Sequence, residues 1–337
     1  MLNVVIVGFG GIARSHKKGY EILEKVGKAR LAAVCDVRSE VFDQEIEINL
    51  TLERTDTVSA YNCYTNLDEM LKKEQIDFVD ICLPSYLHRE YAVKLMEKGY
   101  HVLCEKPMAL NHEDCVAMLE AERKSGKRFM IAQVLRFFCE YEYLKTCIAE
   151  NTFGKPLSAS FYRFSRPPVW GWENWFMDYD KSGGGITDLH IHDVDIVRYL
   201  FGEPKSVSCR VVDTCTRYDI IQTAFYYNDL IVSAQGAWAS KQTKFSAGYR
   251  VDFENAAVVY ENGTVTVYPN DDRTPFSPDL VGWDGYTNEI AYFSDLVTGT
   301  IENKKNTSSS AAQTIRLIET MKQSADQNGQ ILAFCAK

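Results

Sequence analysis

The first 26 residues place the strongest constraint on how this chain can fold. The β-branched run at residues 4–7 is typical of a strand buried on both faces of a parallel sheet. A glycine-rich hexapeptide, Gly8–Ala13, follows it directly, and the apolar periodicity of residues 11–26 predicts a helix. A strand, a glycine-rich turn and a helix in this order can bind the pyrophosphate of a dinucleotide, because amide groups at a helix N-terminus favour anions.

Small residues have separate roles in such a loop. Gly8 permits the tight turn, Gly10 lets the backbone approach the pyrophosphate, and Ala13 keeps the helix close to the strand. Asp36 ends the second predicted strand, where a carboxylate can bond the adenosine ribose and repel a 2′-phosphate, which favours NAD. Arg38 could contact such a phosphate, so NADP stays open. The alternative is a glycine turn and a surface aspartate with no ligand.

Strand and helix patterns alternate through the first 133 residues. Predicted strands cover residues 31–35, 78–83, 101–104 and 129–132, and predicted helices cover residues 38–52, 89–98 and 111–125. This alternation implies parallel pairing, so we expect a Rossmann-type doubly wound α/β domain over residues 1–133. From residue 157 the apolar period shifts toward two. Hairpin signals at 228–229 and 262–263 then predict a mostly antiparallel sheet within a second domain, residues 134–337.

Two predicted strands of the first domain end in polar motifs. The strand at 78–83 runs into Leu83-Pro84-Ser85 with His88, and the strand at 101–104 runs into Glu105-Lys106-Pro107, whose Lys–Pro bond could be cis. Ligands of doubly wound sheets bind beyond the carboxyl ends of the strands. The Lys106 ammonium could therefore stabilise an alkoxide, while the alternatives are a strand-end ion pair for Glu105 and a structural hydrogen bond for His88. The predicted cofactor contacts are Gly8, Phe9, Gly10, Gly11, Ile12, Asp36, Arg38, Leu83, Pro84, Ser85, His88, Glu105 and Lys106.

A second set of polar groups follows the glycine run at 183–185. On a predicted helix over residues 186–200, Asp188 and His192 are i, i+4 neighbours, and Asp195 continues their face. A carboxylate one turn from an imidazole can orient the ring and raise its basicity. The alternative is a buried polar helix whose side chains bond to neighbours. His190 points to another side of that helix, so it does not pair with His192, and we predict no metal site.

The segment 161–175 is dense in aromatic and polar residues. Trp172 suits the apolar face of a sugar ring, and Arg163 could bind hydroxyls or a carboxylate; the alternative is a loop that packs across the sheet. Arg136 could also line the cleft. The predicted substrate contacts are Lys106, Arg163, Trp172, Asp188 and His192.

Taken together, these motifs resemble the glucose-fructose oxidoreductase / inositol dehydrogenase / rhizopine catabolism (Gfo/Idh/MocA) family. The resemblance covers nearly the whole chain and rests on Gly8–Ala13 with His16, Pro84 with His88, Glu105-Lys106-Pro107, and Asp188 with His192. It implies that Lys106, Asp188 and His192 are catalytic. It also implies a C-terminal α/β domain with a large open sheet, through which family members form homodimers or homotetramers. One departure is His190, where the family often has glycine, and this could reshape the substrate site.

The resulting prediction is an NAD(P)-dependent oxidoreductase that moves a hydride between the nicotinamide and a carbinol carbon of a sugar, a polyol or a related small molecule. The alternatives are a non-enzymatic dinucleotide sensor, an NAD-dependent glycoside hydrolase that works through transient oxidation, and an NADP-linked aldose or diol dehydrogenase. Each keeps the same fold and differs in chemistry.

Composition narrows the partners and the location. The formal net charge is −9, which argues against nucleic acid and anionic lipid as partners. The ten cysteines contain no Cys-x-x-Cys pair, which argues against a zinc site or a disulfide framework. The chain opens directly on a predicted strand and has no long apolar run, so we expect a cytoplasmic protein without a membrane anchor.

Overall fold

The computed structural model describes residues 1–43 and 61–335, which fold into two compact units. The first unit comprises Met1–Val134, Pro168–Ser182 and Trp283–Ala312, and the second comprises Leu135–Pro167, Gly183–Gly282 and Gln313–Lys337. The chain leaves the first unit where the predicted boundary lies. It returns to that unit twice, however, so residues 134–337 do not form one continuous domain.

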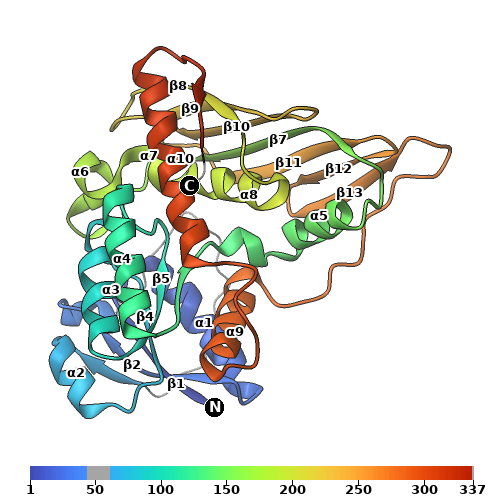
Figure 1. Cartoon of the computed structure of the whole chain (residues 1–337). Coiled ribbons are helices and arrows are strands. Elements are labelled where there is room, and N and C mark those ends of the chain that lie inside the picture. The colour runs from blue at the N-terminus through green and yellow to red at the C-terminus, as the bar shows by residue number, and fades with distance from the viewer. Residues whose placement is uncertain (44–60, 336–337) are drawn as a thin grey trace. The chain divides into compact units, whose positions relative to one another are not determined.

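A six-stranded parallel sheet forms the core of the first unit, in the order β3-β2-β1-β4-β5-β6. Its strands are β1 (Leu2–Val7), β2 (Ala29–Cys35), β3 (Asn62–Tyr64), β4 (Phe78–Ile81), β5 (His101–Glu105) and β6 (Phe129–Ala132). Its helices are α1 (Gly11–Lys25), α2 (Leu67–Lys73), α3 (His88–Glu97), α4 (His112–Ser125), α6 (Tyr179–Ser182) and α9 (Gly285–Thr298). In Figure 1, α1 and α9 cover one face of this sheet, and α3 and α4 cover the other. The predicted doubly wound sheet is confirmed.

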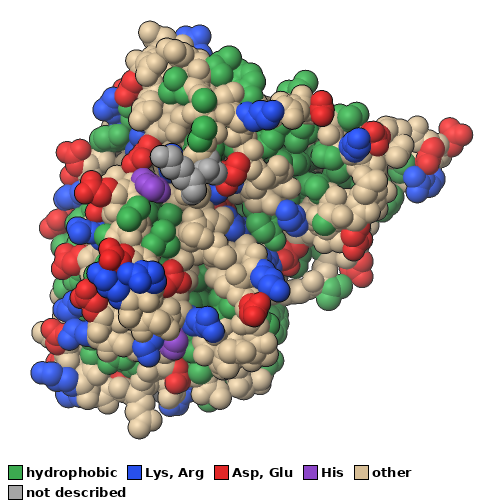
Figure 2. Space-filling model, in the orientation of Figure 1, with side chains coloured by type: hydrophobic (Ala, Val, Ile, Leu, Met, Phe, Trp, Pro, Cys, Tyr) green, Lys and Arg blue, Asp and Glu red, His purple; other side chains and the backbone are tan. Residues whose placement is uncertain are grey.

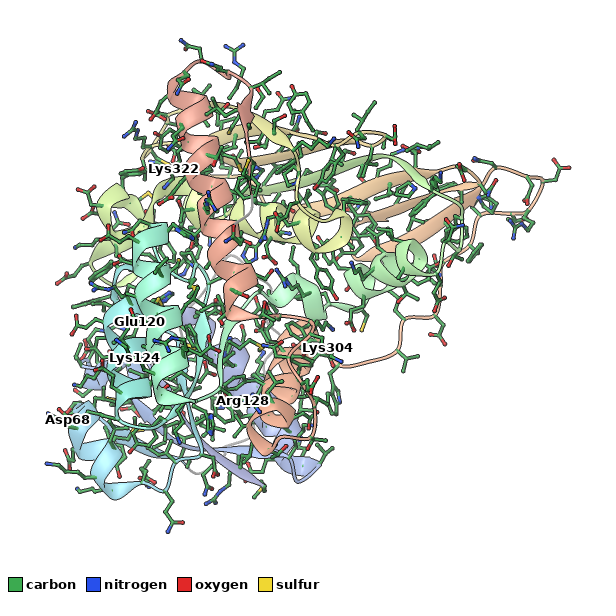
Figure 3. All side chains as sticks on the ribbon, viewed as in Figure 1. Asp68, Glu120, Lys124, Arg128, Lys304 and Lys322 are labelled. Atoms are coloured by element: carbon green, nitrogen blue, oxygen red, sulfur yellow. The ribbon has the colours of Figure 1, made fainter. Side chains whose placement is uncertain are left out.

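Local sequence signals account for most of these elements. All residues of β4 and of β6 are buried, as expected for strands covered on both faces. The Asn111 side chain caps α4 by accepting from the Asp114 amide at 2.8 Å, and Gly126 ends the helix in the left-handed conformation. On the outer face of α4, Glu120 and Lys124 form a surface ion pair of 2.8 Å (Figure 3).

The first unit differs from the prediction at three places. Of the helix expected over residues 38–52, Ser39–Phe42 form a 3-10 turn, and residues 44–60 lie outside the described part of the chain. The apolar periodicity of the sequence did not predict the short elements β3 and α2. The late helix α9 packs on α1, and its Phe293 meets Phe78 of β4 with ring centroids 5.1 Å apart. This apolar contact explains why the chain returns to the first unit.

An eight-stranded sheet forms the core of the second unit, in the order β13-β12-β11-β7-β10-β9-β8-β14. Its strands are β7 (Pro156–Ser165), β8 (Ser206–Val212), β9 (Ile220–Tyr226), β10 (Ile231–Trp238), β11 (Ser246–Phe253), β12 (Ala256–Glu261), β13 (Thr264–Pro269) and β14 (Leu332–Ala333). All neighbours pair antiparallel except β7 and β10. The predicted, mostly antiparallel sheet is confirmed.

Helices cover one face of this second sheet. They are α5 (Cys139–Ala149), α7 (Gly184–Asp188) and α8 (Ile191–Phe201), and Figure 1 shows α5 and α8 on the same side of the strands. The last helix, α10 (Ser308–Asp326), begins in the first unit and continues in the second. Along β9 and β10 buried and more exposed residues alternate, as expected for a sheet packed on one face.

The surface carries both signs of charge. On the face of the first unit seen in Figure 2, Lys and Arg side chains are interspersed with Asp and Glu. An example is Asp68 of α2 (labelled in Figure 3), which lies 3.7 Å from Lys94 of α3 and 3.5 Å from Lys98, the residue after that helix. None of the helices within the described residues combines the length and the apolar character needed to cross a bilayer.

His190 lies between α7 and α8 and is fully buried beneath the second sheet. Its Nε2 is 3.0 Å from the Thr223 hydroxyl oxygen, and its Nδ1 has no hydrogen-bond partner among the described residues. A Cβ on Gly236 of β10 would lie 2.9 Å from Nδ1, so only glycine leaves room for this ring. Burial, with a smaller contribution from the Arg163 charge, lowers the pKa of His190 to about 3.

This burial predicts a loss of stability in mild acid. An unfolded chain binds a proton on His190 below about pH 6.5 and the folded chain does not, so the free energy of unfolding should fall by about 2 kcal/mol between pH 6.5 and pH 5. A His190→Gln variant keeps a donor near Thr223 and cannot titrate. Denaturant titrations of both proteins across this range measure the difference. Parallel pH profiles for the two would contradict the prediction.

Candidate functional site

Three motifs of the first unit lie at one edge of its sheet. The neighbouring strands β1, β4 and β5 pair in register, with Val7 opposite Ile81 and Ile81 opposite Cys104. The segments that follow them are the glycine loop, the Leu83–His88 segment and the Glu105–Pro107 segment. Residues far apart in the chain are therefore brought to the carboxyl ends of three adjacent strands, where doubly wound sheets bind ligands.

The glycine loop fits a dinucleotide. Gly8 has φ +87°, and a Cβ there would lie 2.7 Å from the Cys82 carbonyl oxygen, so glycine is required. Gly10 is the N-cap of α1 and contributes no side-chain cap, and a Cβ on it would meet nothing within 4 Å. The open space and the helix N-terminus suit a pyrophosphate. Ala13 and the Phe9 ring are fully buried, so Phe9 could reach a ligand only through its backbone.

Asp36 is placed for the ribose but already has protein partners. Its Oδ2 accepts from the Phe9 amide at 2.9 Å, and both oxygens accept from the Arg38 guanidinium at 3.0 Å. The same guanidinium lies 5.6 Å from the ring centroid of Trp172. Trp172 was predicted to bind substrate, but here it lies beside the predicted cofactor residues of its own unit.

His88 uses both ring nitrogens within the first unit. Nε2 lies 2.8 Å from the Leu83 carbonyl oxygen, and Nδ1 lies 2.7 Å from the Pro107 carbonyl oxygen. Burial lowers the pKa of His88, although both carbonyl contacts favour a protonated ring. The ring links the ends of β4 and β5, which favours the structural interpretation over contact with the nicotinamide. Ser85 is also buried.

The Lys106–Pro107 peptide bond is cis, as a bond before proline allows. The Lys106 side chain is half-buried at the edge of the sheet, whereas the Glu105 side chain turns inward. Glu105 Oε1 lies 3.0 Å from Nε2 of His16, and Oε2 accepts from the Lys106 amide at 2.9 Å. The predicted alternative was a strand-end ion pair between Glu105 and a lysine or arginine, but the partner is instead a histidine, His16 of α1.

His16 belongs to the motif that carries the family resemblance, but the sequence predicted neither a role for it nor the involvement of Asp80 and Tyr20. The ring of His16 also bonds Asp80 in the middle of β4, with Nδ1 2.8 Å from Oδ2, and the Tyr20 hydroxyl donates to the same oxygen at 2.7 Å. Asp80 and His16 are both fully buried. An aspartate inside the apolar strand at residues 78–81 was the available signal, because a buried charge needs a partner.

In the second unit, Asp188 and His192 do not share one continuous helix. Asp188 ends α7, Leu189 and His190 interrupt the helix, and His192 is the second residue of α8. The predicted helix over 186–200 is therefore two, and the i, i+4 argument was wrong in its premise. Asp188 and His192 are nevertheless the only half-buried residues in the otherwise buried stretch 182–198.

The two predicted cleft arginines are buried in ion pairs of the second unit. Arg163 donates to Asp193 at 3.0 and 3.3 Å, and its side chain is 6% exposed. Arg136 forms a bidentate pair with Asp195, with both distances 2.7 Å. These pairs attach α8 to β7 and to the segment before α5. His190 likewise packs beneath the sheet, away from solvent.

Removing one partner of a buried pair should be costly. Asp193→Ala leaves the Arg163 guanidinium buried without its carboxylate, and we expect the free energy of unfolding to fall by about 3 kcal/mol or more. Asp271→Ala removes the partner of the exposed Arg273 and should change stability little. Thermal unfolding of both variants is the measurement. If the two variants lose equal stability, the buried pair is not a structural anchor, and Arg163 is again a candidate substrate contact.

Comparison with known proteins agrees with this architecture. Residues 2–133 match the family described as "Oxidoreductase family, NAD-binding Rossmann fold", and residues 141–274 match the "GFO/IDH/MocA C-terminal domain". One curated relative is 2,7-anhydro-N-acetylneuraminate hydratase of Escherichia coli (strain K12), 36% identical over 151 residues, or 43% of this chain and 39% of that protein. Another is myo-inositol 2-dehydrogenase of Thermotoga maritima, 29% identical over 204 residues, or 60% of this chain and 55% of that protein. The matches thus span only about two fifths to just over half of these relatives.

Solved structures share the fold over the full chain. Aldose-aldose oxidoreductase from Caulobacter crescentus, complexed with glycerol, has a TM-score of 0.82 at 19% identity and covers 99% of both chains. The WlbA dehydrogenase from Bordetella pertussis, in complex with NADH and UDP-GlcNAcA, has a TM-score of 0.80 at 18% identity and covers 100% of this chain and 99% of its own. The sequence matches and the two-unit architecture together show that this chain belongs to the Gfo/Idh/MocA family of NAD-binding oxidoreductases.

Proposed function

We propose that the protein transfers a hydride between a bound nicotinamide dinucleotide and a carbinol carbon of a sugar, a polyol or a related small molecule. The observation that carries the proposal is the arrangement of the first sheet. The open glycine loop after β1 and the half-buried Lys106 after β5 lie at the same edge, separated only by β4. A ligand bound along this edge can meet both.

The cofactor contacts follow from this edge. Backbone amides at Gly10, Gly11 and Ile12 would hold the pyrophosphate, and Asp36 would hold the adenosine ribose. The bidentate Asp36–Arg38 pair keeps the guanidinium on the carboxylate, which favours NAD over NADP. When bound, the dinucleotide supplies the acceptor or donor of the hydride.

The protein supplies proton transfer and charge stabilisation. In the oxidation direction the substrate carbon loses a hydride and its hydroxyl loses a proton. His192 accepts that proton as general base, and Asp188 orients the imidazole. Lys106 stabilises the oxyanion that develops on the hydroxyl oxygen. The half-buried positions of all three side chains support this assignment, since general bases and oxyanion stabilisers must reach the substrate.

A second candidate is a reaction without net redox change. The similarity to a protein named 2,7-anhydro-N-acetylneuraminate hydratase favours it, although that match covers only 43% of this chain. Such a reaction would consume water and substrate without accumulating NADH.

We also propose that the protein forms the homodimer or homotetramer expected from the family resemblance. Apolar side chains paired across neighbouring strands of the second sheet are exposed: Ile231 (76%) beside Tyr226 (38%), and Val212 (58%) beside Ile220 (36%). A group of exposed apolar side chains on one sheet supports an interface there.

Substitutions at the proposed catalytic residues provide the main test. With NAD and a panel of polyols, aldoses and anhydro-sugars, Lys106→Ala and His192→Ala should each lower kcat/KM by at least about 100-fold. NAD affinity, measured by calorimetry, should stay within about threefold. Residues that act as one unit lose activity non-additively, so the double variant should be little worse than either single one.

The same assay separates the alternatives. NADH accumulation in step with product supports net oxidation, and product without NADH supports the redox-neutral candidate. If the Lys106→Ala variant converts substrate nearly as fast as the unsubstituted protein, the proposed catalytic roles are wrong. A dinucleotide sensor would bind NAD tightly and convert no compound on the panel.

Cofactor choice can be tested at Asp36. Asp36→Ala removes the ribose acceptor and releases Arg38, so NADH affinity should fall by about tenfold and NADPH affinity should rise relative to it. Arg38→Ala is the matched control and should leave NADH affinity nearly unchanged. Titrations of both nucleotides into each variant measure the ratio. An unchanged preference in Asp36→Ala would show that another residue selects the cofactor.

A further inference from the structure

We propose that His16 is a positioning residue for Lys106: its Nε2 holds the Glu105 carboxylate, and that carboxylate holds the backbone amide of Lys106. The inference rests on the proposed function, in which Lys106 contacts the substrate. It adds His16 of α1, which precedes Lys106 by 90 positions in the chain, to the residues that support the proposed reaction. All the groups concerned belong to the first unit.

The contacts form an unbroken chain of hydrogen bonds. Asp80 Oδ2 lies 2.8 Å from His16 Nδ1, His16 Nε2 lies 3.0 Å from Glu105 Oε1, and Glu105 Oε2 lies 2.9 Å from the Lys106 amide nitrogen. His16 and Asp80 are fully buried and Glu105 is 5% exposed. Each bond is therefore shielded from competing water.

His16 is fixed from the far side before it reaches Glu105. The Tyr20 hydroxyl donates to Asp80 at 2.7 Å, the Cys82 sulfur lies 3.7 Å from the other Asp80 oxygen, and the Tyr286 ring centroid is 5.9 Å from that of His16. These neighbours hold the ring plane, so Nε2 points to Glu105.

The hydrogen-bond partners of His16 determine the protonation state of its ring. Both carboxylates only accept hydrogen bonds, so a ring that faces both donates from both nitrogens and carries a positive charge. Burial alone lowers the pKa of His16, but the Asp80 charge and hydrogen bond more than offset this, and the pKa is raised well above its ordinary value. The imidazolium therefore persists at neutral pH and pairs with Glu105.

Lys106 needs this support because of where it lies. The last ladder pair between β5 and β6 is Glu105 with Ala132, and beyond it the Lys106 amide bonds to a side chain. On its other side, the Pro107 carbonyl is held by His88 at 2.7 Å. Two buried histidines thus anchor the backbone before and after a long, flexible lysine, and a shift of about 1 Å at such a group can cost about 100-fold in rate.

Two substitutions separate this role from a structural one. The amide nitrogen of His16→Gln occupies about the place of Nε2 and can still donate to Glu105, whereas that of His16→Asn occupies about the place of Nδ1 and can donate only to Asp80. Both variants lose the buried positive charge and one hydrogen bond, so their melting temperatures should fall by similar amounts.

The expected results differ for function. In His16→Asn, kcat should fall by about 10- to 100-fold and the Lys106 amide should exchange with deuterium at least about tenfold faster than in His16→Gln. His16→Gln should keep kcat within about threefold, with NAD affinity unchanged in both. Asn66→Ala, which loses the N-terminal cap of α2 and touches none of these groups, should lower the melting temperature and leave kcat alone.

Three outcomes would overturn the inference. The first is equal kcat and equal exchange in the two His16 variants, and the second is a kcat that follows melting temperature across the set including Asn66→Ala. The third is a stoichiometric metal ion lost from both His16 variants, since ligand atoms of His16, Asp80 and Cys82 lie within 4.8 Å of one another. The proposed function fails separately, if Lys106→Ala keeps turnover. If Lys106→Ala abolishes turnover and the two His16 variants agree, only the positioning role is wrong.

Discussion

The parallel, in-register pairing of β1, β4 and β5 is the constraint from which the rest of the first unit follows. It brings three chain segments to one edge and leaves almost no room between them, as the 2.7 Å from a Gly8 Cβ to the Cys82 carbonyl oxygen shows. The glycine loop, the His88 link and the Glu105–Lys106 turn all depend on this spacing. A slip of one residue would reverse which side chains face inward.

Buried charge is accepted in this chain where it is paired. In the first unit, His16 lies between Asp80 and Glu105; in the second, Arg163 bonds Asp193. Such pairs add little net stability compared with apolar packing, but breaking one is expensive. They therefore act mainly as fixed points that set the orientation of strands and helices next to the predicted ligand residues.

Exposure divides the polar residues of the motifs into two groups. His88, Glu105 and Arg163 are buried and bonded within their own units, whereas Lys106 is half-buried at the edge of the sheet. Asp188 and His192 stand out in the same way from a buried stretch. A motif read from the sequence thus contains side chains that could contact a substrate and side chains that hold those in place, and only burial distinguishes them.

By itself the sequence determined the two sheets, the glycine loop with its required Gly8, and the family, because period, turn residues and small side chains are local signals that tertiary contacts reinforce here. Tertiary structure alone decided the return of α9 to the first unit, the break between Asp188 and His192, and the partners of His16, Asp80 and Arg163. The return of α9 depends on the apolar contact between Phe293 and Phe78, and the partners of the three polar residues depend on which buried polar atoms meet across long chain separations. No local periodicity contains that information.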